Sequence, residues 1–165
     1  MPPLFLLASI LLSFLCKCQG DSIDDVCSNS RNPSLCDHTL RADVRSRGAS
    51  LRGLGKIILE NAQSSTQATM DVAKSINGNK DNKEIADICI KICNFAIQNL
   101  NDCQALLKAR NRESISALKA KAMTALIDVS ACDDEFAASE PPTLRKATSK
   151  AQDFISMILA VANRL

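Results

Sequence analysis

Apolar residues recur every three or four positions along most of the chain, which is the spacing of one face of an α-helix. The first long stretch of this kind covers residues 49–76 and the second covers 83–109. A third begins near Arg112, and the last follows the sequence SEPPT at 139–143. The clearest loop is NGNKDN at 77–82. Four amphipathic helices with short connections predict an all-α protein built as an up-down four-helix bundle.

The second stretch shows most clearly which face of a helix we expect in the core. Its apolar positions keep helical spacing over the whole segment, so one stripe should turn inward while polar residues stay in solvent. The residues of this stripe are Ile85, Cys89, Ile92, Ala96, Cys103 and Leu107.

A shorter helical extension precedes the bundle. Asn32-Pro33 combines a preferred capping residue with proline at the first helical position, which predicts a helix from about Pro33 to Val44. Cys27 and Cys36 flank this start, and a bond between them would contribute roughly 2.5 to 3 kcal/mol on the loop-entropy model. A short helical hairpin has little core of its own, so we interpret this pair as a structural disulfide.

The amino-terminal segment has the pattern of a secretory leader. Residues 4–15 are apolar, too short a run for a bilayer, which needs about 20 residues. Small residues follow at cleavage spacing: Cys18 and Gly20 suit a cut before Asp21, and Cys16 and Cys18 suit a cut before Gln19. We expect a signal peptide at 1–20 and a secreted, extracellular protein without a membrane anchor. The remainder, 21–165, should be one domain with a hairpin extension (21–48) and a bundle (49–165).

Composition narrows the class of function. The chain of 165 residues has no Trp or Tyr, which favours helices over strands. Its formal net charge of +2 falls by one if Lys17 leaves with the leader, and no basic stripe stands out. Binding to nucleic acid is therefore not indicated.

The sequence offers no recognisable catalytic or metal site. The single histidine, His38, lies on the extension, with no nucleophile elbow or CxxC pair to accompany it. Adjacent carboxylates occur at Asp24-Asp25 and Asp133-Asp134, but neighbouring side chains on a helix point apart, so we interpret them as solvated charges. We expect no cofactor and no enzymatic activity.

Three motifs resemble one known family. CSNSRNPSLC at 27–36, followed by LRADVRSRGASLRGLGKI at 40–57, resembles the amino-terminal region of the plant invertase and pectin methylesterase inhibitors. ADICIKICNFAIQNL at 86–100 is similar to a second motif of that family, with Cys93 where tyrosine is usual. ACDDEF at 131–136 resembles a third. The motifs occur in the family's order over nearly all of the chain that follows the leader.

The resemblance implies a four-helix bundle preceded by a helical hairpin, and two disulfides. Transferred by motif, these are Cys27–Cys36 and Cys89–Cys132. Cys93 and Cys103 fall outside the pattern. Cys103 lies on the apolar stripe and is interpreted as a buried free thiol, whereas Cys93 lies four residues from Cys89 and can compete for Cys132.

The resemblance also implies an inhibitor of a plant cell-wall enzyme. One possible target is pectin methylesterase, which the inhibitor would bind in a 1:1 complex that occludes the enzyme's pectin-binding cleft. The other is a cell-wall or vacuolar acid invertase. KARNRES at 108–114 lacks the proline and phenylalanine of a motif that invertase inhibitors often carry, and RNPSLC and LRGLGKI are closer to the pectin methylesterase inhibitors. We therefore favour pectin methylesterase as partner, in the apoplast. A non-inhibitory defence or storage protein of the same fold is the third alternative.

A candidate binding face follows from burying the stripe of 83–109. Related inhibitors use the side of the bundle, so the polar faces of the second and third long helices are candidates for contact; an ordinary solvated face is the alternative interpretation. The candidate residues are Lys91, Asn94, Gln98, Asn101, Lys108, Glu113, Thr124, Asp128 and Glu135.

Overall fold

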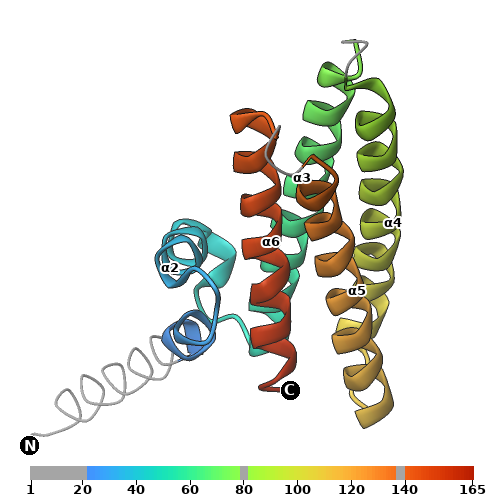
Figure 1. Ribbon diagram of the computed structural model, residues 1–165. Helices are drawn as coiled ribbons and strands as arrows, with labels where there is room; N and C mark the ends of the chain where they lie inside the picture. The colour runs from blue at the N-terminus through green and yellow to red at the C-terminus, as the bar shows by residue number, and fades with distance from the viewer. Residues whose placement is uncertain (1–21, 79–81, 137–139) are drawn as a thin grey trace, which may run out of the picture.

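The computed structural model describes residues 22–78, 82–136 and 140–165, and over these ranges every regular element is helical (Figure 1). Residues 22–28 form a first helical segment. The elements that follow are α2 (Pro33–Ala42), the 3₁₀ turn η1 (Val44–Ser46), α3 (Leu51–Ile76), α4 (Lys83–Lys108), α5 (Arg112–Phe136) and α6 (Pro142–Ala162). The all-α prediction is confirmed. The predicted leader lies outside the described residues.

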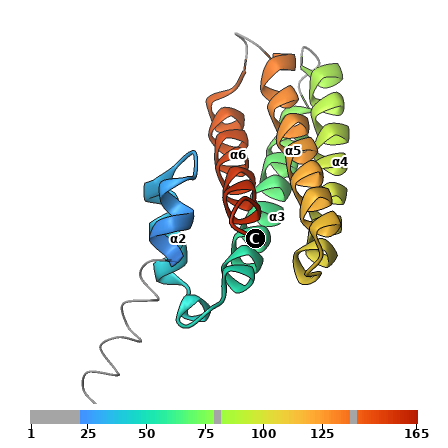
Figure 2. The ribbon, with the colours of Figure 1, turned by 90° about the horizontal axis from the view of Figure 1, so that it is seen from below.

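The four long helices pack as a closed up-down bundle. α3 packs against α4 and α6, and α5 packs against the same two helices, so each has two neighbours around a shared core. Figure 2 shows the four helices grouped together, with α2 on the α6 side. None of the helices within the described ranges has the length and apolar character that crossing a bilayer requires.

Side-chain caps fix the starts of the helices where the sequence indicated them. The Asn32 side chain accepts a hydrogen bond from the Leu35 amide at 3.1 Å, with Pro33 at the first helical position. Ser50 caps α3 in the same way, accepting from Gly53. The extension helix ends at Ala42, slightly earlier than predicted, because Asp43 caps the separate 3₁₀ turn.

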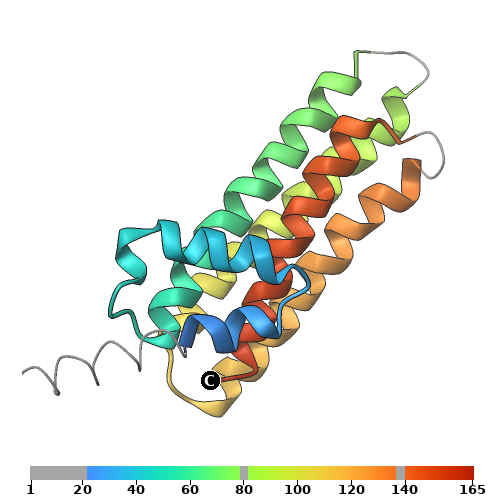
Figure 3. The same ribbon diagram turned by 90° about the vertical axis from the view of Figure 1, so that its left-hand side faces the viewer.

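The amino-terminal hairpin, residues 22–46, packs across the side of the bundle that α6 and α3 form (Figure 3). The five residues from Ala151 to Ile155 are all buried, although one face of a bundle helix would normally reach solvent. One side of α6 faces the bundle core and the opposite side is covered by the hairpin. This covering explains why the polar residues Gln152 and Asp153 are buried.

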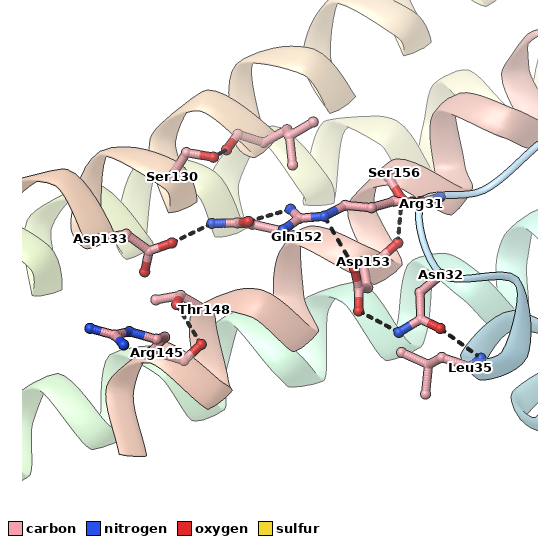
Figure 4. Close-up of polar contacts among 11 residues, drawn as sticks. Arg31, Asn32, Leu35, Ser130, Asp133, Arg145, Thr148, Gln152, Asp153 and Ser156 are labelled. Atoms are coloured by element: carbon pink, nitrogen blue, oxygen red, sulfur yellow. Dashed lines mark hydrogen bonds and ion pairs between the residues drawn. The ribbon is translucent and has the colours of Figure 1, made fainter. Parts of the chain in front are cut away.

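Polar bonds join the hairpin to that covered side of α6 (Figure 4). The Asn32 side-chain amide donates to Asp153 Oδ2 at 2.9 Å, and Arg31 Nε lies 3.5 Å from Asp153 Oδ1. The Arg31 guanidinium also donates to Gln152, whose amide donates in turn to Asp133 Oδ2 of α5 at 2.6 Å. The chain of contacts therefore runs from the hairpin through α6 to α5.

Within the described residues there are two disulfides, with the pairing that the resemblance implies. Cys27–Cys36 closes the hairpin, with its Cα atoms 5.3 Å apart. Cys89–Cys132 joins α4 to α5, with a Cα separation of 4.9 Å. The second bond lies in a separate apolar cluster at one end of the bundle, with Phe136.

The inward stripe of α4 is confirmed at Cys89, Ala96, Cys103 and Leu107 and differs from the prediction at the two isoleucines. Ile85 and Ile92 are only partly buried, whereas Ala86, Cys93 and Leu100 are fully buried. These three positions are spaced by seven residues, so they stay on one line directed at the bundle axis, and the larger isoleucines fall on its flanks.

Gly55 permits a close approach between bundle helices. A Cβ at this position would lie 3.0 Å from Val161 Cγ1 and 3.1 Å from Leu107 Cδ1. The glycine therefore lets α3 pack tightly against both α6 and α4.

Candidate interaction face

The outward sides of α4 and α5 form one continuous surface whose register is fixed by polar contacts. The Asn99 amide donates to Asp128 Oδ2 at 3.3 Å, and Lys121 Nζ donates to Asn99 Oδ1 at 3.3 Å. Lys121 also lies 2.7 Å from Asp102 Oδ2. We call this surface the α4–α5 face and define it by Lys91, Phe95, Asn99, Asp102, Lys121, Thr124, Ile127 and Asp128.

Two large apolar side chains, Phe95 and Ile127, are exposed on this face, and Met123 is exposed beside it on the α6 side of α5; the sequence analysis missed all three. Phe95 is 49% exposed on α4, and Met123 and Ile127 are 46% and 61% exposed on α5. Phe95 lies one helical turn from Asn99, so it is close to the level of Asp128 and Ile127 across the helix pair. These residues are out of phase with the buried stripes, and that mismatch was the signal in the sequence. Exposed aromatic and aliphatic residues bordered by polar groups are typical of a protein interaction site.

The predicted candidate residues do not all meet on this face. Lys91, Thr124 and Asp128 belong to it, and Asn94 and Gln98 are also exposed on α4. Asn101, however, accepts a hydrogen bond from Gln63 of α3, so it borders α3. The list of predicted residues therefore spans two sides of α4.

Three further candidates lie away from the centre of the face. Lys108 lines a groove between α3 and α4, together with Arg52 and Lys56. Glu113 and Glu135 are exposed at opposite ends of α5, roughly 33 Å apart at ~1.5 Å per residue. They cannot belong to one compact contact site.

Asp128 is the partly buried carboxylate of the face. Burial raises its pKa, and the hydrogen bond from Asn99 opposes that rise because it stabilises the charged form. The carboxylate is therefore held in a fixed position between the two helices.

Of the adjacent carboxylates, Asp24, Asp25 and Asp134 are exposed, as interpreted from the sequence. Asp24 pairs with Arg41 at 2.6 Å, and Asp25 pairs with Arg164 near the carboxyl end. Asp133 is partly buried and accepts the bond from Gln152, so interpreting it as a solvated charge was wrong, because α6 packs beside it. His38 is exposed on α2. None of these groups is arranged as a nucleophile with a base.

One group of possible metal ligands occurs within the described residues. The Sγ atoms of Cys89, Cys93 and Cys132 lie within 4.8 Å of one another. Two of them form the disulfide, and a disulfide sulfur is not the thiolate that binds metal. In this oxidised state the cluster offers one thiol.

Comparisons with known proteins agree on one family. The family described as plant invertase/pectin methylesterase inhibitor matches residues 21–161. A pectinesterase inhibitor of Actinidia deliciosa is 27% identical over 154 residues, which cover 90% of this chain and 82% of the relative. Pectinesterase inhibitor 2 of Arabidopsis thaliana is 23% identical over 151 residues, covering 89% and 86%.

Two solved structures share the fold. The crystal structure of a mutant form of a pectin methylesterase inhibitor from Arabidopsis superposes with a TM-score of 0.73 at 21% identity, covering 87% of this chain and 97% of that one. A second, of a pectin methylesterase inhibitor from Arabidopsis thaliana, gives 0.64 at 22% identity, covering 88% and 96%. At this level of identity the likeness establishes the fold.

Proposed function

Because the chain belongs to the plant invertase/pectin methylesterase inhibitor family, we propose that it binds a plant pectin methylesterase and covers the cleft that receives pectin. The family consists of inhibitor proteins rather than enzymes, so a protein partner is expected. The observation that carries the choice of target is that both curated relatives are pectinesterase inhibitors matched over most of their length.

The α4–α5 face is the proposed contact surface. Phe95 and Ile127 provide an apolar centre, and Lys91 and Asp128 provide charged groups beside it. Interfaces typically combine buried aromatic anchors with a polar rim, and a few anchors carry most of the binding energy. The Cys89–Cys132 bond and the contacts of Asn99 hold the two helices in register, which lowers the entropy lost on binding.

Inhibition of this kind needs no chemical step. A rigid pair of helices that occupies the substrate cleft excludes the polysaccharide by steric overlap, and one face per chain gives a 1:1 complex. The predicted leader would bring the inhibitor to the cell wall, where the enzyme acts.

The direct test is a titration of the purified, oxidised protein into a plant pectin methylesterase and, separately, a cell-wall invertase at mildly acidic pH. We expect esterase activity to fall to its floor at an equimolar ratio while invertase is unaffected. Inhibition of invertase alone would show that invertase, and not pectin methylesterase, is the target. A folded protein that affects neither enzyme would leave the family assignment but refute inhibition of these two targets.

Variants locate the contact surface. Phe95→Ala combined with Ile127→Ser should weaken inhibition by about 100-fold, since each removes a candidate anchor. The matched control is Val44→Ser, because Val44 is 72% exposed on η1, away from the α4–α5 face. Charge reversal at Lys91 and Asp128 together should also weaken inhibition. Unchanged inhibition by both α4–α5 variants would place the contact elsewhere on the bundle.

A further inference from the structure

Three sulfur atoms form a compact group at one end of the bundle. Cys93 lies one helical turn from Cys89 on α4, and their Sγ atoms and that of Cys132 on α5 lie within 4.8 Å of one another. All three residues are fully buried. Cys103, the other free cysteine, lies further along α4 and outside this group.

We propose that the Cys93 thiol exchanges with the Cys89–Cys132 disulfide, so that the protein interconverts between two disulfide isomers linking α4 to α5 at different turns. This thiol–disulfide exchange is separate from the proposed inhibition and does not depend on it. Solvent oxidants and reductants have poor access to buried sulfur, whereas the third thiol is already in place.

The bonds and electrons of the exchange reaction balance without any other reactant. Cys93 loses its proton, and the thiolate Sγ attacks Cys132 Sγ to form a Cys93–Cys132 bond. The Cys89–Cys132 bond breaks, and its electron pair passes to Cys89 Sγ, which then takes up a proton. One thiol and one disulfide are present before and after the step, so no oxidant or reductant is needed.

Chain entropy hardly distinguishes the two isomers. Cys89 and Cys132 are 43 residues apart, and moving the bond to Cys93 shortens the closed ring by four residues. Both bonds cross from α4 to α5, and in either case the displaced sulfur stays inside the same apolar cluster. The ratio of isomers therefore depends on local packing around the three sulfurs.

Burial controls the rate of exchange. It raises the pKa of Cys93 to about 12, and the charges of Asp128 and Asp133 on α5 contribute to the rise. Glu140 interacts with Asp133 and is itself paired with Arg145. α3 and α6 contribute non-titrating residues to the cluster, namely Met70, Ala73 and Leu144. Since the thiolate is the nucleophile, exchange should be slow in acid and about tenfold faster for each unit of rising pH.

Proteolysis can distinguish the isomers in the unmodified protein. Trypsin and a protease that cuts before aspartate would leave the cysteines of the group in separate peptides, 87–91, 92–101 and 128–132. The protein is held at about pH 5, 7 or 9, then denatured in acid with N-ethylmaleimide to block thiols before digestion. We expect the peptide pair 92–101/128–132 to appear beside 87–91/128–132, at a rate that increases with pH.

Variants supply the controls. Cys93→Ser should show only the 87–91/128–132 link at every pH. Cys89→Ser should form the Cys93–Cys132 bond during oxidative folding, leaving neither cysteine alkylated. The proposal is overturned if the unmodified protein keeps a single link after prolonged incubation at about pH 9, or if the new link joins 87–91 to 92–101 instead. The unmodified protein alone decides the question, so the proposal can still be tested if a variant fails to fold.

Discussion

The hairpin and the bundle use different means to hold their helices. In the bundle, four helices surround a continuous apolar core in which residues such as Leu118, Val129 and Ile155 are fully buried. The hairpin adds Leu40 and Val26 to the edge of this core, contacts both α6 and α3, and depends further on the Cys27–Cys36 bond and on polar contacts of Arg31 and Asn32. The bundle helices therefore provide one another's partners, whereas the hairpin requires the packed surface of α6 and α3.

This difference predicts that destabilising substitutions in the two regions have unequal effects on global stability. Loss of a core side chain in the bundle should lower the stability of the whole molecule. Loss of a contact in the hairpin should release mainly the hairpin, since local segments can open without global unfolding.

The largest effect is expected in the bundle core. Leu118→Ala should lower the free energy of unfolding by about 3 kcal/mol, because it removes a fully buried side chain and leaves a cavity. Leu40→Ala makes the same chemical change in the hairpin and should lower global stability much less, while hydrogen exchange at α2 amides rises. Urea unfolding and hydrogen exchange measure the two quantities. Equal losses of global stability in both variants would contradict the comparison.

Removal of the hairpin disulfide should have the next largest effect. Cys27→Ser with Cys36→Ser should cost the hairpin about 2 to 3 kcal/mol, because the ring no longer restricts its unfolded chain. Amides of residues 33–42 should then lose protection while those of α4 keep theirs. If protection in α4 falls by as much as in α2, the hairpin and bundle unfold as one unit.

A pH effect should arise at the start of α6, which is polar although it belongs to the bundle. Burial raises the pKa of Glu140, the bond from Arg145 opposes the rise, and neighbouring Asp133 adds to it. A carboxyl whose folded pKa is raised stabilises the fold below its unfolded pKa, and this contribution is lost as pH rises through the folded value. Glu140→Gln should therefore lose less stability than the unmodified protein between about pH 4 and 7. Urea unfolding midpoints of both proteins, measured at about pH 4 and pH 7, test this. An equal change of midpoint with pH in the two proteins would refute it.

The smallest effect concerns close packing in the bundle. Gly55→Ala should destabilise by about 1 kcal/mol, since the new Cβ would press on Val161 and Leu107. Gly78→Ala is the matched control, because among the described residues nothing lies within 4 Å of a Cβ there. Thermal melting of the two variants should separate them. A more stable Gly55→Ala protein would mean that the neighbouring side chains yield easily.

The bundle could be predicted because helical periodicity reports burial within each segment. The cap at Asn32 and the loop NGNKDN marked boundaries in the sequence, and the structure adds a cap at Ser50 and a positive φ of 74° at Gly48. The docking of the hairpin could not be predicted, because Gln152 and Asp153 resemble solvent-facing residues until a partner distant in sequence covers them.

The candidate site was predictable only in part. The polar residues of α4 and α5 indicated an outward face, but sequence cannot say which of them border α3, as Asn101 does through Gln63. Phe95 and Ile127 were overlooked because apolar residues were assigned to the core. The pairing of Cys89 with Cys132 came from resemblance alone, and the proximity of Cys93 to both sulfurs required the packed helices.

The position of α6 between the bundle and the hairpin has a consequence for synthesis on the ribosome. The hairpin is made first, yet the helix that it covers is the last of the bundle to emerge. Until α6 emerges the hairpin has only part of its packing surface, namely its contacts with α3, and the apolar side chains that α6 will cover remain accessible to chaperones or to other nascent chains. The Cys27–Cys36 bond closes within the earliest part of this domain, so its formation can hold the hairpin compact until α6 arrives. Early formation of this disulfide would then limit the exposure of the hairpin's apolar side chains until α6 is available to pack against them.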